Sequence, residues 1–164
     1  MKAVANIGYA IDALYAAGAR DIVLMNMPNL GATPLLNGEN GLLDMPYYGE
    51  GLAQGYNVAL SVTQALLAYY LPDLNIYSID VFSLMDEFIN GGYFDNTTNM
   101  LIANLGSNES YLFWDDIHPT TYAHSLIADA VYAKVAPVPE PSTIVLMGLG
   151  LVGLAGMGRK KFRK

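Results

Sequence analysis

The sequence contains no cysteine, which excludes disulfide bonds, thiolate metal sites and a cysteine nucleophile. Charged residues are also scarce: they make up 14% of the 164 residues, whereas 53% are hydrophobic. Such a composition is not that of a disordered acidic chain. The length allows one domain of ordinary size with a real apolar core.

Basic residues are few and unevenly placed. Fifteen acidic residues outnumber eight basic ones, which gives a formal net charge of -7. Five of the eight basic residues lie within 159–164, so residues 1–158 carry three basic and fifteen acidic side chains, a net charge of -12. The chain therefore offers no positive field for a polyanion, which argues against nucleic-acid binding.

The last 28 residues, 137–164, differ from the rest in composition. The run Ser142–Gly158 carries no charge and, at about 1.5 Å per residue, lies at the short end of helices that cross a bilayer. The basic cluster that follows it favours a cytoplasmic tip, with the body of the chain on the other side. A buried core helix is the alternative, although glycines scattered along the run disfavour it. Before the run, Pro139 and Pro141 flank Glu140, and alternating prolines keep a backbone extended and accessible to a processing enzyme.

These three parts together resemble the PEP-CTERM sorting signal. The resemblance implies recognition of Pro139, Glu140 and Pro141 by an exosortase-type processing enzyme in a Gram-negative bacterium. It further implies that the C-terminal helix anchors the protein in the inner membrane before the protein reaches the cell surface. The first residues do not form a matching export signal, because Asn6 and Asp12 interrupt their apolar run. We therefore expect an N-terminal part to be missing.

Hydrophobic periodicity predicts an α/β body over residues 1–136. Val4, Ile7, Ile11 and Leu14 fall on one helical stripe, which Gly18 ends. Short apolar runs without polar alternation are typical of strands buried on both faces of a parallel sheet. On these criteria we expect strands at 21–27 and 75–80, helices at 50–70, 81–89 and 120–135, a long loop at 29–49 and an irregular stretch at 93–114. This order favours a partial three-layer α/β/α sandwich with a parallel sheet, whose other strands we expect upstream.

The candidate chemistry lies just before the last helix. Asp115 precedes His118 by three residues, so its carboxylate can accept a hydrogen bond from one ring nitrogen and leave the other free as a base. Pro119 suits a first helical turn and Thr120 can cap it, so a helix start with an incidental histidine is an equally open interpretation. A metal site is disfavoured because the only other histidine, His124, has no carboxylate at ligand spacing.

This Asp-x-x-His-Pro pattern resembles the last block of the GDSL, or SGNH, esterase and lipase family, and residues 14–20 and 22–34 resemble the helix, strand and loop that precede its C-terminal half. The resemblance implies an SGNH-hydrolase, flavodoxin-like fold with its N-terminal strands missing. It also implies that Asp115 orients the imidazole, that His118 is the general base, and that Asp116 is a variable neighbour. We expect His124 to be structural. The implied substrate is an ester of a lipid or an acylated sugar, and the implied chemistry needs no cofactor.

The family's nucleophile block is not found in residues 1–164, which contain no Gly-Asp-Ser. We therefore expect residues 1–136 to be the C-terminal portion of a surface-exported serine ester hydrolase whose serine is encoded upstream, followed by a sorting signal at 137–164. The alternative is a non-catalytic, membrane-anchored surface or matrix-binding protein derived from a hydrolase.

Overall fold

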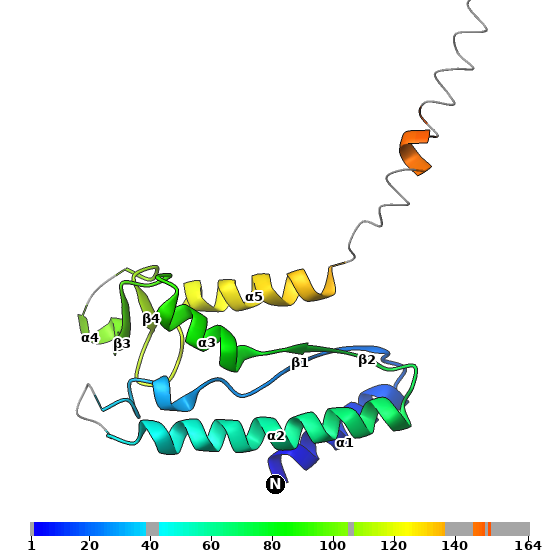
Figure 1. The fold of residues 1–164 in the computed structure, drawn as a ribbon, viewed down its shortest axis with the longest axis horizontal. Helices are drawn as coiled ribbons and strands as arrows, with labels where there is room; N and C mark the ends of the chain where they lie inside the picture. Colours follow the sequence, from blue (N-terminus) through cyan, green and yellow to red (C-terminus); the bar gives the residue numbers. More distant parts are fainter. Residues whose placement is uncertain (1, 39–42, 105–106, 137–145, 150, 152–164) are drawn as a thin grey trace, which may run out of the picture. The chain divides into compact units, whose positions relative to one another are not determined.

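The computed structural model describes residues 2–38, 43–104, 107–136, 146–149 and 151 (Figure 1). The chain divides into two compact units, Met1–Lys134 and Val135–Lys164. The first unit contains all the strands that the structure describes, and it carries both Asp115 and His118.

The N-terminal part of the body is a helix-strand-helix-strand unit. Its elements are α1 (Lys2–Ala16), β1 (Asp21–Met25), the 3-10 turn η1 (Leu30–Ala32), α2 (Pro46–Tyr70) and β2 (Asn75–Ile79). β1 and β2 pair in parallel, with Asp21 opposite Asn75 and Met25 opposite Ile79. Parallel strands need a long crossover connection, which α2 supplies. The predicted parallel strands and the helix between them are confirmed.

α1 ends where the sequence predicts. Gly18 has a φ of 103°, in the left-handed region that residues with a side chain rarely adopt. The N–H groups of Ala17 and Ala19 donate to the carbonyls of Ala13 and Leu14, at 3.0 Å each. These bonds satisfy carbonyl groups at the end of the helix and turn the chain into β1.

The C-terminal part of the body continues from the end of β2. It comprises α3 (Val81–Asn90), β3 (Asn96–Met100), α4 (Leu101–Asn104), β4 (Tyr111–Phe113) and α5 (Thr121–Val135). β3 and β4 form a second parallel pair, with Asn96 opposite Tyr111 and Met100 opposite Phe113. The predicted helices at 81–89 and 120–135 are confirmed.

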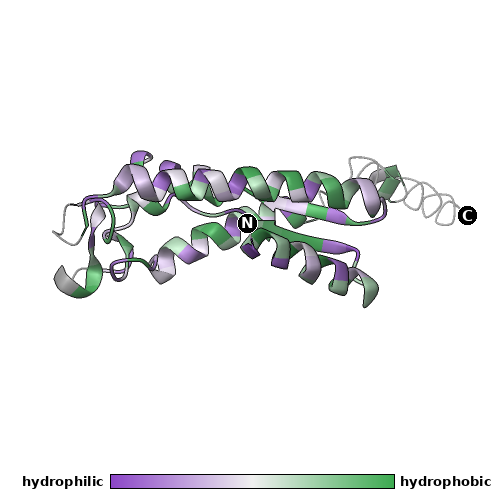
Figure 2. Cartoon of the chain, turned by 90° about the horizontal axis from the view of Figure 1, so that it is seen from below, coloured by the Kyte–Doolittle hydropathy of each residue, from purple (hydrophilic) through white to green (hydrophobic). Residues whose placement is uncertain are grey.

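Each pair of strands has its own apolar cluster. Under β1 and β2, Ile11 of α1 and Leu67 of α2 pack with Leu74, and the sheet adds Ile22, Leu24 and Ile76. The second cluster joins α3, β4 and α5 through Met85, Phe88, Phe94, Leu112, Phe113 and Ala123. Apolar residues recur in bands along α2 (Figure 2), as expected for a helix with one face on a sheet.

Two sequence-based expectations were wrong. The stretch 93–114 is not irregular but contains β3, α4 and β4. Strands are recognised by alternating apolar and polar residues, and neither strand shows this pattern. β3 begins with the polar sequence Asn-Thr-Thr-Asn, and β4 is only three residues long. The loop expected at 29–49 is shorter, because α2 begins at Pro46, a proline at the first helical position.

The expected membrane span, Ser142–Gly158, lies mostly outside the described residues, as do Pro139, Glu140 and Pro141. Of the span, residues 146–149 and 151 are described, and they are helical. Across the described parts of the chain, no helix combines the length and the apolar character that crossing a membrane requires.

Candidate functional site

The site begins with a tight turn between β4 and α5. The carboxylate Oδ1 of Asp115 accepts the backbone N–H of Ile117 at 2.9 Å and that of His118 at 2.7 Å. The backbone N–H of Trp114 donates across the turn to the carbonyl of His118 at 2.7 Å. An aspartate that bonds backbone groups two and three residues ahead fixes such a turn locally. The sequence spacing Asp-x-x-His therefore produces a defined geometry.

The same carboxylate holds the imidazole. Nδ1 of His118 lies 2.8 Å from Oδ2 and 3.1 Å from Oδ1 of Asp115. The His118 side chain is 71% exposed, whereas that of Asp115 is 28% exposed. When Nδ1 carries the ring proton and donates it to Asp115, Nε2 is left with a lone pair facing accessible space. The sequence prediction that these two residues pair is confirmed, although the pairing alone assigns no reaction.

The electrostatics of the turn favour an ionised Asp115. Burial raises the pKa of this carboxyl, but the backbone N–H groups of His118 and Ile117, together with the His118 side chain, outweigh burial and lower the pKa below its usual value. A carboxylate that stays charged can only accept hydrogen bonds. It therefore selects the imidazole form that has its proton on Nδ1.

Thr120 anchors the turn to the core. Its hydroxyl donates to the carbonyl of Tyr111 at 2.9 Å and accepts the N–H of Ala123 at 3.3 Å. Its own N–H donates to the carbonyl of Leu112 at 2.9 Å. Thr120 and Leu112 are both fully or almost fully buried. The threonine thus caps α5 as the sequence suggests, and it ties the site to the strand that carries it.

The segment that follows β1 reaches the same turn. The N–H of Leu35 donates to the carbonyl of Asp116 at 2.8 Å, and Nδ2 of Asn37 donates to the carbonyl of Thr98 at 3.2 Å. Asp116 therefore bonds to the segment after β1 through its backbone carbonyl, whereas Asp115 bonds to the turn through its side chain. Two segments that are far apart in sequence jointly position the loop.

Sequence reasoning missed a polar network where β1 and β2 end. Nδ2 of Asn26 donates to Oδ1 of Asp80 at 2.8 Å, and Oδ1 of Asn26 accepts the N–H of Phe82 at 3.0 Å. Asp80 also accepts the N–H of Ser83 at 3.1 Å, which caps α3. Burial raises the pKa of Asp80, but the Asn26 and Ser83 donors lower it overall. The sequence did contain a signal, because a polar residue, Asn26 or Asp80, directly follows each apolar strand. Parallel sheets bind ligands beside the carboxyl ends of their strands, which is where these two residues lie.

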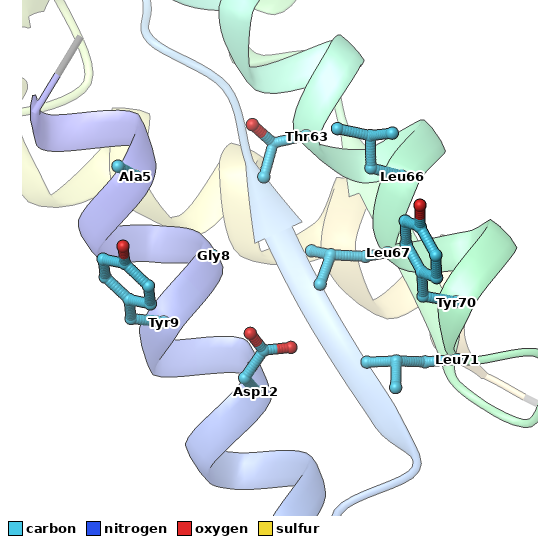
Figure 3. A pocket seen from close by; sticks show the side chains of 9 residues that line it. All are labelled: Ala5, Gly8, Tyr9, Asp12, Thr63, Leu66, Leu67, Tyr70 and Leu71. Carbon is cyan, nitrogen blue, oxygen red and sulfur yellow. The ribbon is translucent and has the colours of Figure 1, made fainter.

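The remaining candidates do not extend the site. Nδ1 of His124 lies 3.0 Å from the carbonyl of Thr120, one turn back in α5, so this ring is held by its own helix. The described residues contain no group of three or more possible metal ligands. A groove of about 430 Å³ lies between α1 and α2 (Figure 3), but neither Asp115 nor His118 lines it.

Comparison with known proteins relates both parts of the chain to described families. The model of the GDSL-like lipase/acylhydrolase family matches residues 2–131, and that of the PEP-CTERM protein-sorting motif matches residues 137–160. The match to the first family covers most of the chain, and the second match begins beyond the end of α5.

Similar curated proteins are plant GDSL proteins. GDSL esterase/lipase At5g42170 of Arabidopsis thaliana is 26% identical in an alignment 140 residues long, which covers 73% of this chain and 38% of the relative. GDSL esterase/lipase APG of the same plant is 24% identical over 156 residues, covering 79% and 43%. The anther-specific proline-rich protein APG of Brassica napus is 26% identical over 137 residues, covering 69% and 29%. The chain thus spans well under half the length of these relatives.

Proposed function

Because the chain belongs to the GDSL-like lipase/acylhydrolase family, we propose that residues 1–136 are the C-terminal portion of a serine ester hydrolase. In this proposal Asp115 and His118 are two members of its catalytic triad. The observation that carries the proposal is the 2.8 Å contact between Nδ1 of His118 and Asp115, with the imidazole otherwise exposed. A histidine held in this way is ready to accept a proton on Nε2.

The proposed mechanism assigns the proton transfers to His118 and the stabilisation of its charged form to Asp115. Nε2 of His118 accepts the proton of a serine hydroxyl while the serine oxygen attacks the ester carbonyl carbon. The resulting imidazolium is stabilised by the Asp115 carboxylate and then protonates the departing alcohol oxygen, which leaves an acyl-serine. His118 next removes a proton from water, whose oxygen attacks the acyl carbon. As the bond to the serine oxygen breaks, the imidazolium returns that proton to the serine oxygen, which releases the acid and the free serine. Asp115 stays ionised throughout, which agrees with its lowered pKa.

The serine in this mechanism comes from polypeptide outside residues 1–164. None of the serines of the sequence lies in a Gly-Asp-Ser block. The matched relatives are more than twice as long as the matched segment, which leaves room for a nucleophile outside it. The proposed substrates are esters of lipids or acylated sugars, and the chemistry uses no cofactor.

The C-terminal segment, residues 137–164, is proposed to direct export. The PEP-CTERM match at 137–160 supports processing by an exosortase-type enzyme at Pro139, Glu140 and Pro141. The uncharged run Ser142–Gly158 is proposed to anchor the chain in the inner membrane, with its basic tip in the cytoplasm. Protease added to spheroplasts should then digest the body and spare the tail. Complete protection of the body would reject this topology.

The catalytic proposal is tested in a protein that contains the nucleophile. Residues 1–164 are joined either to their own upstream reading frame or to the N-terminal half of a close homologue. Activity is then measured with p-nitrophenyl butyrate. His118→Ala should lower turnover by about 10⁶-fold, as loss of a triad base does. His124→Ala is the matched histidine control and should retain most of the activity.

The two neighbouring aspartates provide a second, sharper comparison. Asp115→Asn should lower turnover by about 10⁴-fold, because an amide selects the wrong imidazole tautomer. Asp116→Asn should have a small effect, because Asp116 contacts the neighbouring segment through its carbonyl. Greater sensitivity at Asp116 would show that the dyad is assigned to the wrong aspartate. Activity that is indifferent to all three residues would show that residues 1–136 supply no member of the triad, and a joined protein without activity would favour the alternative of a non-catalytic surface or matrix-binding protein.

A further inference from the structure

The surface of α2 that is turned away from the sheet has two chemically different flanks. The flank away from α1 is polar, and Gln54 and Ser61 are exposed on it. The flank on the side of α1 is apolar, although its large side chains are mostly in contact with solvent. The exposed members of this apolar flank are Tyr48, Leu52, Val62, Leu66 and Tyr69.

The apolar flank has the spacing of a helix-pairing surface. Its positions are alternately four and three residues apart, and they are Tyr48, Leu52, Gly55, Ala59, Val62, Leu66 and Tyr69. We call these seven residues the outer stripe. Apolar residues that recur every 3.5 residues on average form a seam that packs against a second helix. The buried residues of α2 lie on another stripe and are Gly49, Ala53, Leu60 and Leu67. α2 thus has one stripe for its own core and a second stripe without a helix on it in the described part of the chain.

Charge distinguishes the outer stripe from the rest of the surface. Residues 1–158 carry a net charge of -12, so two copies of the chain repel each other over most approaches. After Glu50, however, α2 has no charged residue, and the sequence stays uncharged as far as Pro72. Two copies that meet along the outer stripe therefore bring no like charges into contact.

We propose that the outer stripe of α2 binds the outer stripe of a second copy of the chain, as an antiparallel helix pair around a two-fold axis. In this arrangement the small residues of one helix face large residues of the other: Gly55 lies opposite Leu66, and Ala59 lies opposite Val62. The two-fold axis repeats both contacts. A parallel pair would instead place Gly55 opposite Gly55 and leave a void that close packing disfavours.

The groove between α1 and α2 adds to this fit (Figure 3). Tyr9 and Tyr70 line the groove, which has a volume of about 430 Å³, and Asp12 lies at one end of it. In the antiparallel pair, Leu52 of the second copy lies opposite Tyr69, at the rim of the groove. Its side chain is removed from water there, which favours association.

The size of the contact indicates a reversible dimer. The outer stripe runs from residue 48 to residue 69, a length of about 32 Å at about 1.5 Å per residue, and a helix is about 10 Å wide. A single helix pair of this size lies at the low end of protein interfaces, below about 1,200 Å² in total, where complexes are weak and transient. We therefore expect association at micromolar or higher concentrations. The proposal concerns the surface of α2 and does not depend on the catalytic proposal.

The lack of native cysteine allows a site-specific test. Leu52→Cys and Tyr69→Cys variants of the full chain, in mild detergent, are mixed in equal amounts and treated with a short bismaleimide cross-linker. The mixture should yield at least about fivefold more covalent dimer than either variant alone, because only residues 52 and 69 lie side by side in the antiparallel pair. The matched control mixes Gln54→Cys with Ala68→Cys, which have the same register on the polar flank and should stay at background.

A charge in the outer stripe should prevent pairing. Val62 is 56% exposed, so Val62→Glu leaves the fold intact, which circular dichroism checks. Added to both cysteine variants, Val62→Glu should lower the yield of covalent dimer by at least about fivefold, because pairing would bury an unpaired charge. Ser61→Glu, which places the same charge on the polar flank, should leave the yield unchanged.

Four results would overturn the proposal. A yield from Leu52→Cys alone that equals that of the mixture would show a parallel or random encounter. An equal yield from the Gln54→Cys and Ala68→Cys mixture would show mere crowding in detergent. Cross-linking that Val62→Glu leaves unchanged would exclude the outer stripe from the contact. Cross-linking that disappears when the chain is joined to its upstream polypeptide would make that polypeptide the occupant. None of these readouts uses esterase activity, so the catalytic proposal keeps its own test.

Discussion

Replacing Asp115 by alanine tests whether this one carboxylate builds the candidate site. The change removes the acceptor of two backbone N–H groups, at 2.9 and 2.7 Å, and of the His118 imidazole. A hydrogen bond to a charged group contributes about 1.5–3 kcal/mol when buried. Because the side chain is 28% exposed, water replaces part of what is lost. We expect the free energy of unfolding to fall by about 1–2 kcal/mol in total.

Asp115→Asn separates the turn from the imidazole. The amide oxygen still accepts the two backbone N–H groups, while the amide nitrogen faces Nδ1 of His118. The free energy of unfolding should therefore fall by less than about half as much as in Asp115→Ala. Both variants are compared by urea denaturation at about pH 7, followed through the fluorescence of the single tryptophan, Trp114, which adjoins Asp115.

The stability difference should also depend on pH. The pKa of Asp115 is lower in the folded protein than in the unfolded chain, so its contribution is fully present above the ordinary aspartate pKa of about 3.9. The contribution is lost as the pH falls through the lower, folded pKa. The difference between wild type and Asp115→Ala should therefore shrink as the pH falls below about 4. A difference under about 0.3 kcal/mol at neutral pH, or one that grows in acid, would refute this reasoning.

Three further predictions concern the scaffold, and all are measured as changes in the free energy of unfolding by chemical denaturation. Phe113→Ala should lower the free energy of unfolding by about 3–5 kcal/mol, because Phe113 is fully buried. Trp114→Ala should lower it by less than about 1.5 kcal/mol, because Trp114 is 50% exposed. Equal losses would contradict the assigned burial. Gly31→Ala should lower the free energy of unfolding by more than about 1 kcal/mol, since the added Cβ would lie 2.1 Å from a carbonyl oxygen at the start of α2. Gly51→Ala, which meets nothing within 4 Å inside that helix, should raise it by about 0.5–1 kcal/mol, and a loss there would be unexpected. Thr120→Val should cost about 1–2 kcal/mol through the lost cap and the unpaired Tyr111 carbonyl, and a neutral result would mean that this cap is unimportant.

The features that the sequence predicted are those determined by local chemistry. The helix at α1 follows from one apolar stripe and its end from Gly18, which requires a positive φ. The pairing of Asp115 with His118 follows from a separation of three residues in a turn that the aspartate itself stabilises. Neither feature needs a partner from elsewhere in the chain, so periodicity and spacing were sufficient to find both.

The features that the sequence did not predict depend on contacts between distant segments. β3 is a polar strand that exists because β4, more than ten residues later, pairs with it. The link between Asn26 and Asp80 joins the ends of two strands, and nothing in either segment alone specifies the other. The bond from Leu35 to the carbonyl of Asp116 involves only backbone atoms, which no side-chain pattern reports. These contacts follow from tertiary packing, which overrides local propensity.

The most direct test of the central claim is the tautomer of His118, read from its imidazole ¹⁵N chemical shifts in the chain as it stands. The measurement is made at about pH 9, where imidazole is neutral, and a His124→Gln variant assigns the signals. If Asp115 orients the ring for catalysis, the proton resides mainly on Nδ1, Nε2 is unprotonated, and Asp115→Asn moves the proton to Nε2. A His118 ring protonated mainly on Nε2 in the wild-type chain, or one that Asp115→Asn leaves unchanged, would contradict the account.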